Sequence, residues 1–404
     1  MTGSTANRWP VQRNVEPLVW ATLEDTPVTV IQGARQVGKS WLTQSVVERL
    51  GGTVYSLDNP TTLARVKADP FAFTTQPTTA VVAFDEAQRL PELMVAIKAA
   101  VDMDRRPGRF LVTGSADLLH VTGARESLAG RAGTVNLAGL SQGELRGVKD
   151  DLIGRMAQDR QWVLRPAEPL SRRDYADAIV GGGYPEALRR AGRRRSSWLG
   201  DYARAVTDHD ARQIAGTQHP GRLLHLLRLI AANPAGEVVL ARLGRDGGIP
   251  ERSVPSYLAV LEDLYLVNHL EPFSRNLTKR ATGRRKAWVA DSALASHLAG
   301  LGAAALDSLD NAEAFGGFLE AFVVGELTKA QAWADVDYRL THFRDSTGPE
   351  VDIVVELPGG QVIGIEVKAT AHPTAKSFRN LEFLKDRLGD RFGQGVVLHT
   401  GTES

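Results

Sequence analysis

The sequence predicts an α/β protein that opens with a mostly parallel sheet and closes with a second strand-containing domain. Three observations lead to this prediction. The stretch "VTVIQGARQVGKSWLTQSVVERL" (28–50) reads as strand, glycine loop and helix. Apolar strands alternate with helical segments as far as residue 145, a pattern typical of parallel sheets covered on both faces. Near the other end, "EVDIVVELPGGQVIGIEVKAT" (350–370) reads as two apolar strands joined by a Pro-Gly-Gly turn.

The composition is that of an ordinary soluble protein. The chain has 404 residues, a formal net charge of +1 and no cysteine. Its length allows about two to four domains with a sizeable core, and the lack of cysteine excludes disulfides and thiolate-bound zinc. It contains neither a signal-peptide core nor a run of about 18 apolar residues that would cross a membrane. We therefore expect a cytoplasmic protein without a membrane partner.

The glycine loop carries the most specific motif. Residues 33–40, "GARQVGKS", fit the pattern G-x-x-x-x-G-K-[ST] at every fixed position. Glycines let the backbone wrap so that its N–H groups point at phosphates, and the following helix adds its dipole. Lys39 is expected to reach the β- and γ-phosphates of ATP, and the Ser40 hydroxyl to ligate magnesium. The predicted nucleotide-binding residues are Gly33, Ala34, Arg35, Gln36, Val37, Gly38, Lys39, Ser40 and Trp41.

Two later strands end in polar residues that suit the same chemistry. "TTAVVAFDEAQRL" contains a strand at 80–84 followed by Asp85 and Glu86. Asp85 is expected to hold magnesium through water and Glu86 to polarise the attacking water, although an acidic pair at a strand end also suits a helix cap. A third strand, "RFLVTGSAD", ends in Thr113-Gly114-Ser115, and Ser115 is the predicted sensor of the γ-phosphate. The catalytic candidates here are thus Lys39, Glu86 and Ser115.

An arginine follows at the start of another strand. In "RESLAGRAGTVNLAGLS", Arg131 lies between a short helix and that strand. Such an arginine is well placed to reach the nucleotide of a neighbouring subunit, and an arginine finger raises hydrolysis by several orders of magnitude. The alternative is an arginine that pairs with a local carboxylate. Residues 1–145 are predicted to form this ATPase core, within a homo-oligomer.

The middle of the chain is basic and largely helical. Residues 146–220 are predicted to form a helical lid or linker. Residues 221–300 read as helix, short helix, glycine turn, helix and two strands around the basic loop "SRNLTKRATGRRK", which is a winged-helix arrangement. The predicted DNA-phosphate contacts are Arg275, Lys279, Arg280, Arg284, Arg285 and Lys286. The alternative is that the winged helix packs against other domains or subunits.

The last segment, 301–404, is predicted to be a restriction-endonuclease-like α/β domain. A helix carrying Glu320 precedes a strand, an Asp352-bearing strand, a strand with Glu366 and Lys368, a helix and a last strand. Asp352 and Glu366 are expected to bind magnesium, with Glu320 supporting the metal and Lys368 orienting water. Period-2 alternation places Glu366 and Lys368 on one face. Alternatively, these carboxylates pair with Lys368 and nearby arginines to stabilise a DNA-binding or subunit-packing surface.

The chain resembles, over nearly its full length, bacterial and archaeal ATP-binding proteins that join an AAA-type ATPase domain to a domain of unknown function numbered 4143. The matching stretches are "GARQVGKS", "FDEAQ", "TGSAD", "SLAGR", "GGYPE", "YLAVLEDLYLV", "SRNLTKR" and "GIEVKAT". The resemblance implies an AAA-type P-loop ATPase and a nuclease-like last domain. Members are expected to continue beyond "VVLHTG", whereas this chain ends at Ser404, so we expect a terminal element to be missing.

Three functions are compatible with these features. The first is an ATPase that uses ATP and magnesium and couples turnover to DNA or a DNA-bound partner. The second is an ATP-gated, metal-dependent DNA nuclease in defence or in a toxin-like role. The third is a nucleotide-controlled scaffold whose last domain binds without cutting. Glu86 separates hydrolysis from mere binding, and Asp352, Glu366 and Lys368 separate cutting from mere contact.

Overall fold

The computed structural model describes residues 10–76, 79–115, 128–159, 170–210, 220–274, 280, 283–345 and 348–401. The chain forms two compact units. The first comprises Met1–Leu140, Tyr184–Glu186 and Asp263–Tyr265, and the second comprises Ser141–Gly183, Ala187–Glu262 and Leu266–Ser404. None of the helices in the described ranges combines the length and the apolar character needed to span a bilayer.

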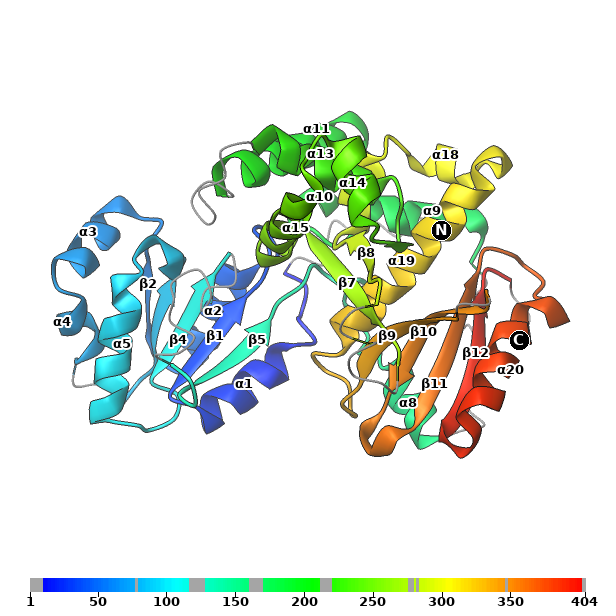
Figure 1. Ribbon diagram of the computed structural model, residues 1–404. Coiled ribbons are helices and arrows are strands. Elements are labelled where there is room, and N and C mark those ends of the chain that lie inside the picture. Colours follow the sequence, from blue (N-terminus) through cyan, green and yellow to red (C-terminus); the bar gives the residue numbers. More distant parts are fainter. Residues whose placement is uncertain are drawn as a thin grey trace. The chain divides into compact units, whose positions relative to one another are not determined.

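A five-stranded parallel sheet forms the centre of the first unit (Figure 1). Its strands are β1 (Val28–Gln32), β2 (Thr53–Ser56), β3 (Val82–Asp85), β4 (Phe110–Gly114) and β5 (Ala132–Asn136), in the order β2-β3-β4-β1-β5. Each neighbouring pair is parallel, which confirms the sheet predicted from the alternation of strands and helices. The helices are α1 (Glu16–Asp25), α2 (Lys39–Arg49), α3 (Pro60–Ala68), α4 (Pro70–Thr74) and α5 (Glu92–Met103).

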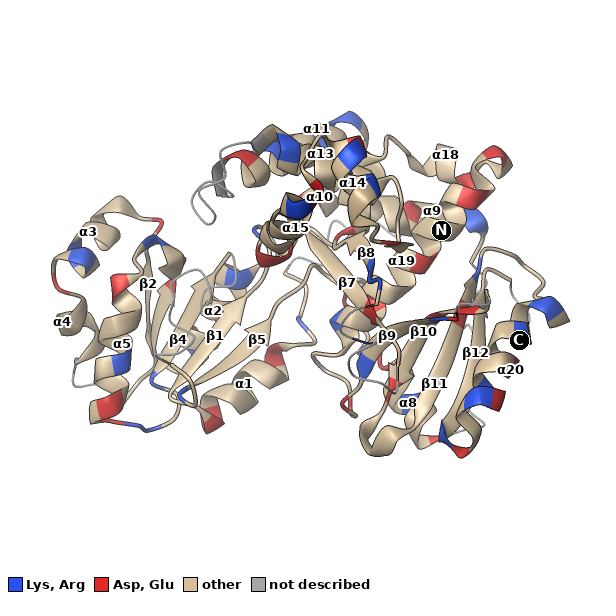
Figure 2. Cartoon of the chain, in the orientation of Figure 1, with Lys and Arg blue, Asp and Glu red and all other residues tan. Residues whose placement is uncertain are grey.

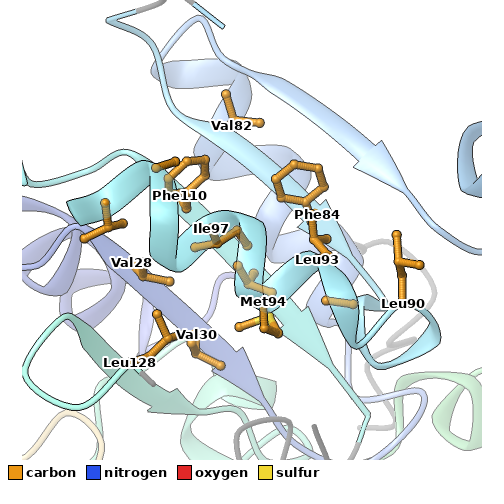
Figure 3. Packing of buried hydrophobic residues seen from close by; sticks show 14 of the residues in the cluster. Val28, Val30, Val82, Phe84, Leu90, Leu93, Met94, Ile97, Phe110 and Leu128 are labelled. Atoms are coloured by element: carbon orange, nitrogen blue, oxygen red, sulfur yellow. The ribbon is translucent and has the colours of Figure 1, made fainter. Parts of the chain in front are cut away.

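The core of this unit lies between the sheet and α5. Alternate residues of the strands, among them Val30, Phe84 and Phe110, pack against Met94 and Ile97 of the helix (Figure 3). Every residue of β1 is buried, so the strand is covered on both faces. Such a strand must be apolar throughout, and this explains why "VTVI" reads as a continuous run rather than as an alternation. The packed sheet provides a rigid support for the loops at its edge.

A seven-stranded mixed sheet runs through the second unit. Its strands are β6 (Gly236–Glu237), β7 (Val267–Pro272), β8 (Lys286–Val289), β9 (Arg339–Arg344), β10 (Glu350–Glu356), β11 (Val362–Lys368) and β12 (Phe392–His399), in the order β12-β11-β10-β9-β7-β8-β6. Strands β7 and β9 pair in parallel, with Glu271 opposite Thr341 and Pro272 opposite His342. This pairing joins the strands of segments 221–300 and 301–404, so the predicted boundary at residue 300 falls within one sheet-containing unit.

Helices lie before and between these strands in the chain. They are α7 (Gln142–Arg146), α8 (Leu152–Gln158), α9 (Arg172–Gly181), α11 (Gly192–Ala205), α13 (Pro220–Ala231), α14 (Leu240–Gly247), α15 (Val254–Asp263), α17 (Ser292–Leu298), α18 (Ala303–Asp307), α19 (Ala312–Ala330) and α20 (Ala375–Leu388), and a further short helix is α10 (Pro185–Leu188). Both α19 and α20 contact β11. Leu381 and Leu384 of α20 pack on Phe343 of β9 and Val354 of β10. The order α19-β9-β10-β11-α20-β12 is the order of elements that the sequence predicts for the last segment.

Candidate functional site

The loop between β1 and α2 has the backbone geometry of a phosphate-binding loop. Gly33 has φ 155° and Gly38 has φ 101°, conformations that side-chain-bearing residues rarely adopt. A Cβ atom on Gly33 would lie 2.1 Å from the carbonyl oxygen of Leu137, so only glycine fits there. The buried Lys39 Nζ donates to the carbonyl oxygens of Gly33 (2.9 Å) and Ala34 (2.8 Å). The lysine side chain therefore lies inside the loop and bonds its first two residues. Ser40, in contrast, is exposed at the first turn of α2.

The acidic end of β3 lies two strands from this loop, with β4 between them. Asp85 is buried, and its Oδ1 accepts a hydrogen bond from the Thr113 hydroxyl of β4 at 2.5 Å. The same hydroxyl oxygen accepts the backbone N–H of Glu86 at 3.0 Å. Glu86 has φ 60°, a left-handed conformation that costs a non-glycine residue of order 1–3 kcal/mol and is found most often at functional sites. Thr113 thus fixes both acidic residues at the carboxyl edge of the sheet.

Gln88 and Thr113 are residues of this site that the sequence did not single out. The Gln88 side-chain amide donates to Glu86 Oε2 at 2.5 Å and to the buried Ser115 hydroxyl at 2.9 Å. It thereby links the predicted water-polarising residue to the predicted phosphate sensor. Within the described residues, its Oε1 is buried without a hydrogen-bond partner. The stretch "FDEAQ" contained this signal, since Gln88 follows the acidic pair by two residues.

Arg131 lies at the amino-terminal end of the parallel strands, whereas the phosphate loop lies at their carboxyl-terminal end. It immediately precedes β5, whereas the phosphate loop follows the end of the adjacent parallel strand β1. Five residues of strand span roughly 16 Å, so Arg131 does not reach the phosphate loop of its own chain. Its guanidinium donates to Asp102 Oδ1 of α5, with Nε at 2.9 Å and Nη2 at 2.7 Å. Within the single chain, Arg131 therefore pairs with a local carboxylate, which is the alternative to an arginine finger.

A second cluster of charged residues lies in the mixed sheet, around Asp352. The pairing of β9 with β10 shifts register between Val351 and Val354, so Asp352 sits in a β-bulge. Bulges turn a side chain away from its regular direction and occur often next to active sites. Asp352 Oδ2 accepts the backbone N–H of Val367 on β11 at 2.8 Å. This bond brings the carboxylate to the strand that carries Glu366 and Lys368.

Those two residues complete the predicted group. Lys368 Nζ lies 3.5 Å from Asp352 Oδ2 and also contacts Glu366 Oε2. Asn380 of α20 donates to the other oxygen of Glu366 at 3.3 Å. Burial raises the pKa of Glu366 to about 7, and the nearby charge of Asp352 acts in the same direction. The structure thus brings Asp352, Glu366 and Lys368 together.

Lys286 is the principal correction to the predicted DNA contacts. It is 3 % exposed, and its Nζ lies 2.8 Å from Glu320 Oε1 and 2.6 Å from Glu350 Oε1. Burial alone would lower the pKa of Lys286, but Glu320, Glu350 and Asp352 together raise it above its ordinary value. A buried ammonium with such partners does not contact DNA phosphates. Strands β8 and β10, which carry Lys286 and Glu350, belong to the same sheet, with β7 and β9 between them (Figure 2).

Glu320, the predicted metal support, is the partner of this lysine. Burial raises its pKa to about 7, with the charge of Asp352 adding to the effect and Lys286 opposing it. Glu350, which the sequence did not single out, has a pKa below its usual value; burial would raise it, but Lys286 and Arg344 more than compensate. Within the described ranges, no three Asp, Glu or His side chains are arranged as ligands of a metal ion.

The other predicted DNA contacts divide into three groups. Arg280 donates to both carboxylate oxygens of Glu356, at 2.8 and 2.6 Å, and its side chain is only 13 % exposed. Arg284 and Arg285 remain accessible, with side chains 66 % and 40 % exposed. Their carboxylate partners, Glu237 and Glu262, lie at 3.5 and 3.7 Å. Arg275 and Lys279 lie outside the described residues.

Comparison with known families identifies two of the predicted parts. Residues 25–146 match the family described as an AAA domain, and residues 315–404 match a domain of unknown function, DUF4143. Residues 172–305 match another domain of unknown function, DUF8612. The chain therefore carries an AAA domain, which confirms the predicted P-loop ATPase domain, and DUF4143. The winged-helix and endonuclease-like descriptions of the later segments stay predictions.

Individual proteins resemble the chain more distantly. Uncharacterized proteins of Mycobacterium bovis and Mycobacterium tuberculosis are each 29 % identical to it over 360 residues, which cover 89 % of this chain and 74 % of theirs. The Walker-type ATPase PABY2304 of Pyrococcus abyssi has a TM-score of 0.45 and 19 % identity, covering 71 % of this chain and 95 % of its own. The ORC2 protein of Aeropyrum pernix, solved as ADPNP–ADP complexes, has a TM-score of 0.36 and 14 % identity, covering 80 % and 95 %.

Proposed function

We propose that the AAA domain binds ATP with magnesium and hydrolyses it. One observation carries this proposal: the Thr113 hydroxyl joins Asp85 to Glu86 at the carboxyl edge of the sheet that also holds the phosphate loop. The groups required for holding phosphates and for activating water thus stand at one edge of a rigid sheet. Ligands of open α/β sheets bind at this edge.

Each residue has a separate task in this proposal. The loop amides and Lys39 would hold the phosphates, since α2 begins at Lys39 and directs its N-terminus toward them. Ser40 and Asp85 would hold the magnesium ion, which supplies positive charge to the phosphates when it is bound. Glu86 would accept a hydrogen bond from the attacking water, and Gln88 and Ser115 would keep its carboxylate in place. Hydrolysis therefore depends on Glu86 and binding on Lys39.

The test compares two variants with the wild type. Lys39→Ala is expected to lose ATP binding, whereas Glu86→Gln should bind ATP and hardly turn it over. Binding would be measured by equilibrium titration with a fluorescent ATP analogue, and turnover by phosphate release. Gln44→Ala is a matched control, because Gln44 lies on the exposed side of α2 and its side chain donates to Glu48 of the same helix. Wild-type turnover in Glu86→Gln protein would remove Glu86 from the role we give it.

We also propose that turnover is coupled to DNA or to a DNA-bound partner. The support is the pair Arg284 and Arg285, which are exposed just before β8. Phosphate contacts carry no sequence preference and weaken with salt. The double substitution Arg284→Ala and Arg285→Ala should therefore weaken binding to all duplexes alike and reduce the salt slope by about two. Arg280→Ala is the control, since Arg280 is largely buried and paired with Glu356. An unchanged salt slope in the double variant would place the proposed DNA contact elsewhere.

A second candidate function is metal-dependent cleavage of DNA by DUF4143. The observation that favours it is the contact of Lys368 with both Asp352 and Glu366, since carboxylates can hold a metal ion and a lysine beside them can orient water. Cleavage of plasmid and single-stranded DNA would be assayed in magnesium and in manganese, with and without ATP. Asp352→Asn should abolish the cutting, whereas the exposed Asp386→Asn should not. If neither wild type nor variants cut, the group serves structure or binding instead.

A further inference from the structure

Arg13 lies outside the segment that matches the AAA domain, which begins at residue 25. It is 4 % exposed, and its guanidinium donates to backbone carbonyls that lie far apart in the sequence. Nη1 donates to Val37 of the phosphate loop at 2.9 Å, and Nη2 donates to Ala138, just after β5, at 2.8 Å. One buried side chain thus ties the phosphate loop to the end of the neighbouring strand.

The bond to Val37 acts on the peptide group that links it to Gly38. In a trans peptide the C=O and N–H point in opposite directions, so a donor on the Val37 carbonyl leaves the Gly38 amide facing away from Arg13. A charged donor on the carbonyl also polarises the peptide and strengthens the N–H as a donor. Gly38 has φ 101°, which side-chain-bearing residues rarely adopt, and a Cβ atom built on it would lie 3.8 Å from Arg13 Nη1.

The position of Arg13 depends on α1, which follows it directly. Val15, which precedes α1, and Val19, within it, are both buried, and α1 packs on β1 and β5. A second polar contact holds α1 to α2: Glu16 Oε1 accepts from Arg49 Nη1 at 2.5 Å and from Trp20 Nε1 at 3.3 Å. Arg49 therefore stabilises the same helix without touching the phosphate loop. A comparison of Arg49 variants with Arg13 variants therefore separates the docking of α1 from the orientation of the phosphate loop.

We propose that Arg13 is a positioning residue for nucleotide binding, which orients the Val37–Gly38 peptide so that its N–H donates to a phosphate. The inference rests on the proposed function, because it concerns the same nucleotide site. It adds to that site a residue from outside the AAA match. Planarity and five donors allow an arginine to bridge two carbonyls, whereas lysine is a point charge that reaches one.

The experiment measures the affinity of purified full-length protein for a fluorescent ADP analogue, which avoids hydrolysis. Arg13→Lys and Arg13→Gln are compared with Arg49→Ala. We expect the Arg13 variants to lose affinity by about 10-fold to 100-fold, the range of one charge-assisted hydrogen bond. Arg49→Ala should melt at a lower temperature than the wild type but bind ADP with unchanged affinity. The loss for ATP should equal the loss for ADP, since both share the phosphates that the loop holds.

Three results would overturn the inference. Folded Arg13→Lys protein with wild-type affinity would show that the loop needs no such tie. An equal loss of affinity in Arg49→Ala would assign the effect to the docking of α1. Failure of Arg13→Lys to fold, seen by circular dichroism, would make Arg13 a residue of folding rather than of positioning. A wild type that binds no nucleotide at all would instead contradict the proposed function.

Discussion

Lys286 Nζ lies 2.8 Å from Glu320 Oε1, a contact that joins the start of β8 to helix α19. Both side chains are largely buried, with exposed fractions of 4 % and 18 %. The contact links a strand of the DUF8612 segment to a helix of the DUF4143 segment. It also brings a fixed positive charge to within reach of the carboxylates around Asp352.

Removal of this charge should destabilise the second unit. Lys286→Met leaves the buried Glu320 without its cation, whereas Glu350 keeps Arg344 at 3.3 Å. Breaking one partner of a buried pair costs about 3–5 kcal/mol. Lys286→Arg keeps the charge and should cost less. Denaturant unfolding followed by intrinsic fluorescence would measure the change, with the exposed Arg284→Met as control. Equal stability of Lys286→Met and wild type would show that the two glutamates do not need a cation.

The free energy of unfolding of the second unit should depend on pH through its two buried glutamates. The pKa values of Glu320 and Glu366 are raised from about 4.5 to about 7 in the folded unit. Between these pH values the folded state holds more protons than the unfolded state, so the free energy of unfolding falls as pH rises. This contribution is fully present below about 4.5 and lost above about 7.

Glu366→Gln should flatten that dependence, because a glutamine does not titrate. Unfolding would be measured at several values between pH 5 and pH 8 at constant ionic strength. The exposed Glu382→Gln on α20 is the control and should keep the wild-type slope. A slope that survives in the double variant Glu320→Gln and Glu366→Gln would assign the pH dependence to other groups.

Thr113 should matter to turnover more than to binding. Thr113→Val keeps the shape of the side chain but removes the hydroxyl that bonds Asp85 and the Glu86 amide. Loss of such a buried bond is worth about 1–3 kcal/mol, so kcat should fall by roughly 5-fold to 150-fold. The control is Thr43→Val, since the Thr43 hydroxyl on α2 is buried without a hydrogen-bond partner in the described residues. Equal kcat in the two variants would contradict the role of Thr113.

Arg131 is predicted to act on the nucleotide of a neighbouring subunit in a homo-oligomer. Neither Arg131→Ala nor Lys39→Ala protein should hydrolyse ATP by itself. Mixed together, they should recover activity, because one interface then combines an intact Arg131 with an intact Lys39. Asp102→Asn is informative as well, since it frees Arg131 from its partner in the same chain. No recovery at any ratio in a mixture shown to co-assemble would rule out action between subunits.

The phosphate loop and the parallel sheet could be predicted from the sequence because their signals are local. Gly33, Gly38 and Lys39 lie in one short stretch whose spacing follows from backbone wrapping around phosphates. Asp85 and Glu86 follow a buried strand, and parallel strands place their carboxyl ends at one edge. The triplet of Glu366 and Lys368 with Asp352 was likewise found, since two of its members share a strand face.

Lys286, Thr113 and Arg13 depended on the tertiary structure. Lys286 stands in a run with Arg284 and Arg285, and the sequence alone gives no reason to treat them differently. Its buried ammonium contacts Glu320 on α19 and Glu350 on β10, which lie 34 and 64 positions further along the chain. The bond of Thr113 to Asp85 joins residues 28 positions apart, and the bond of Arg13 to Ala138 joins residues 125 apart. Composition and periodicity determine which segments become strands and helices, but the partner of a buried charge is decided only when those segments pack.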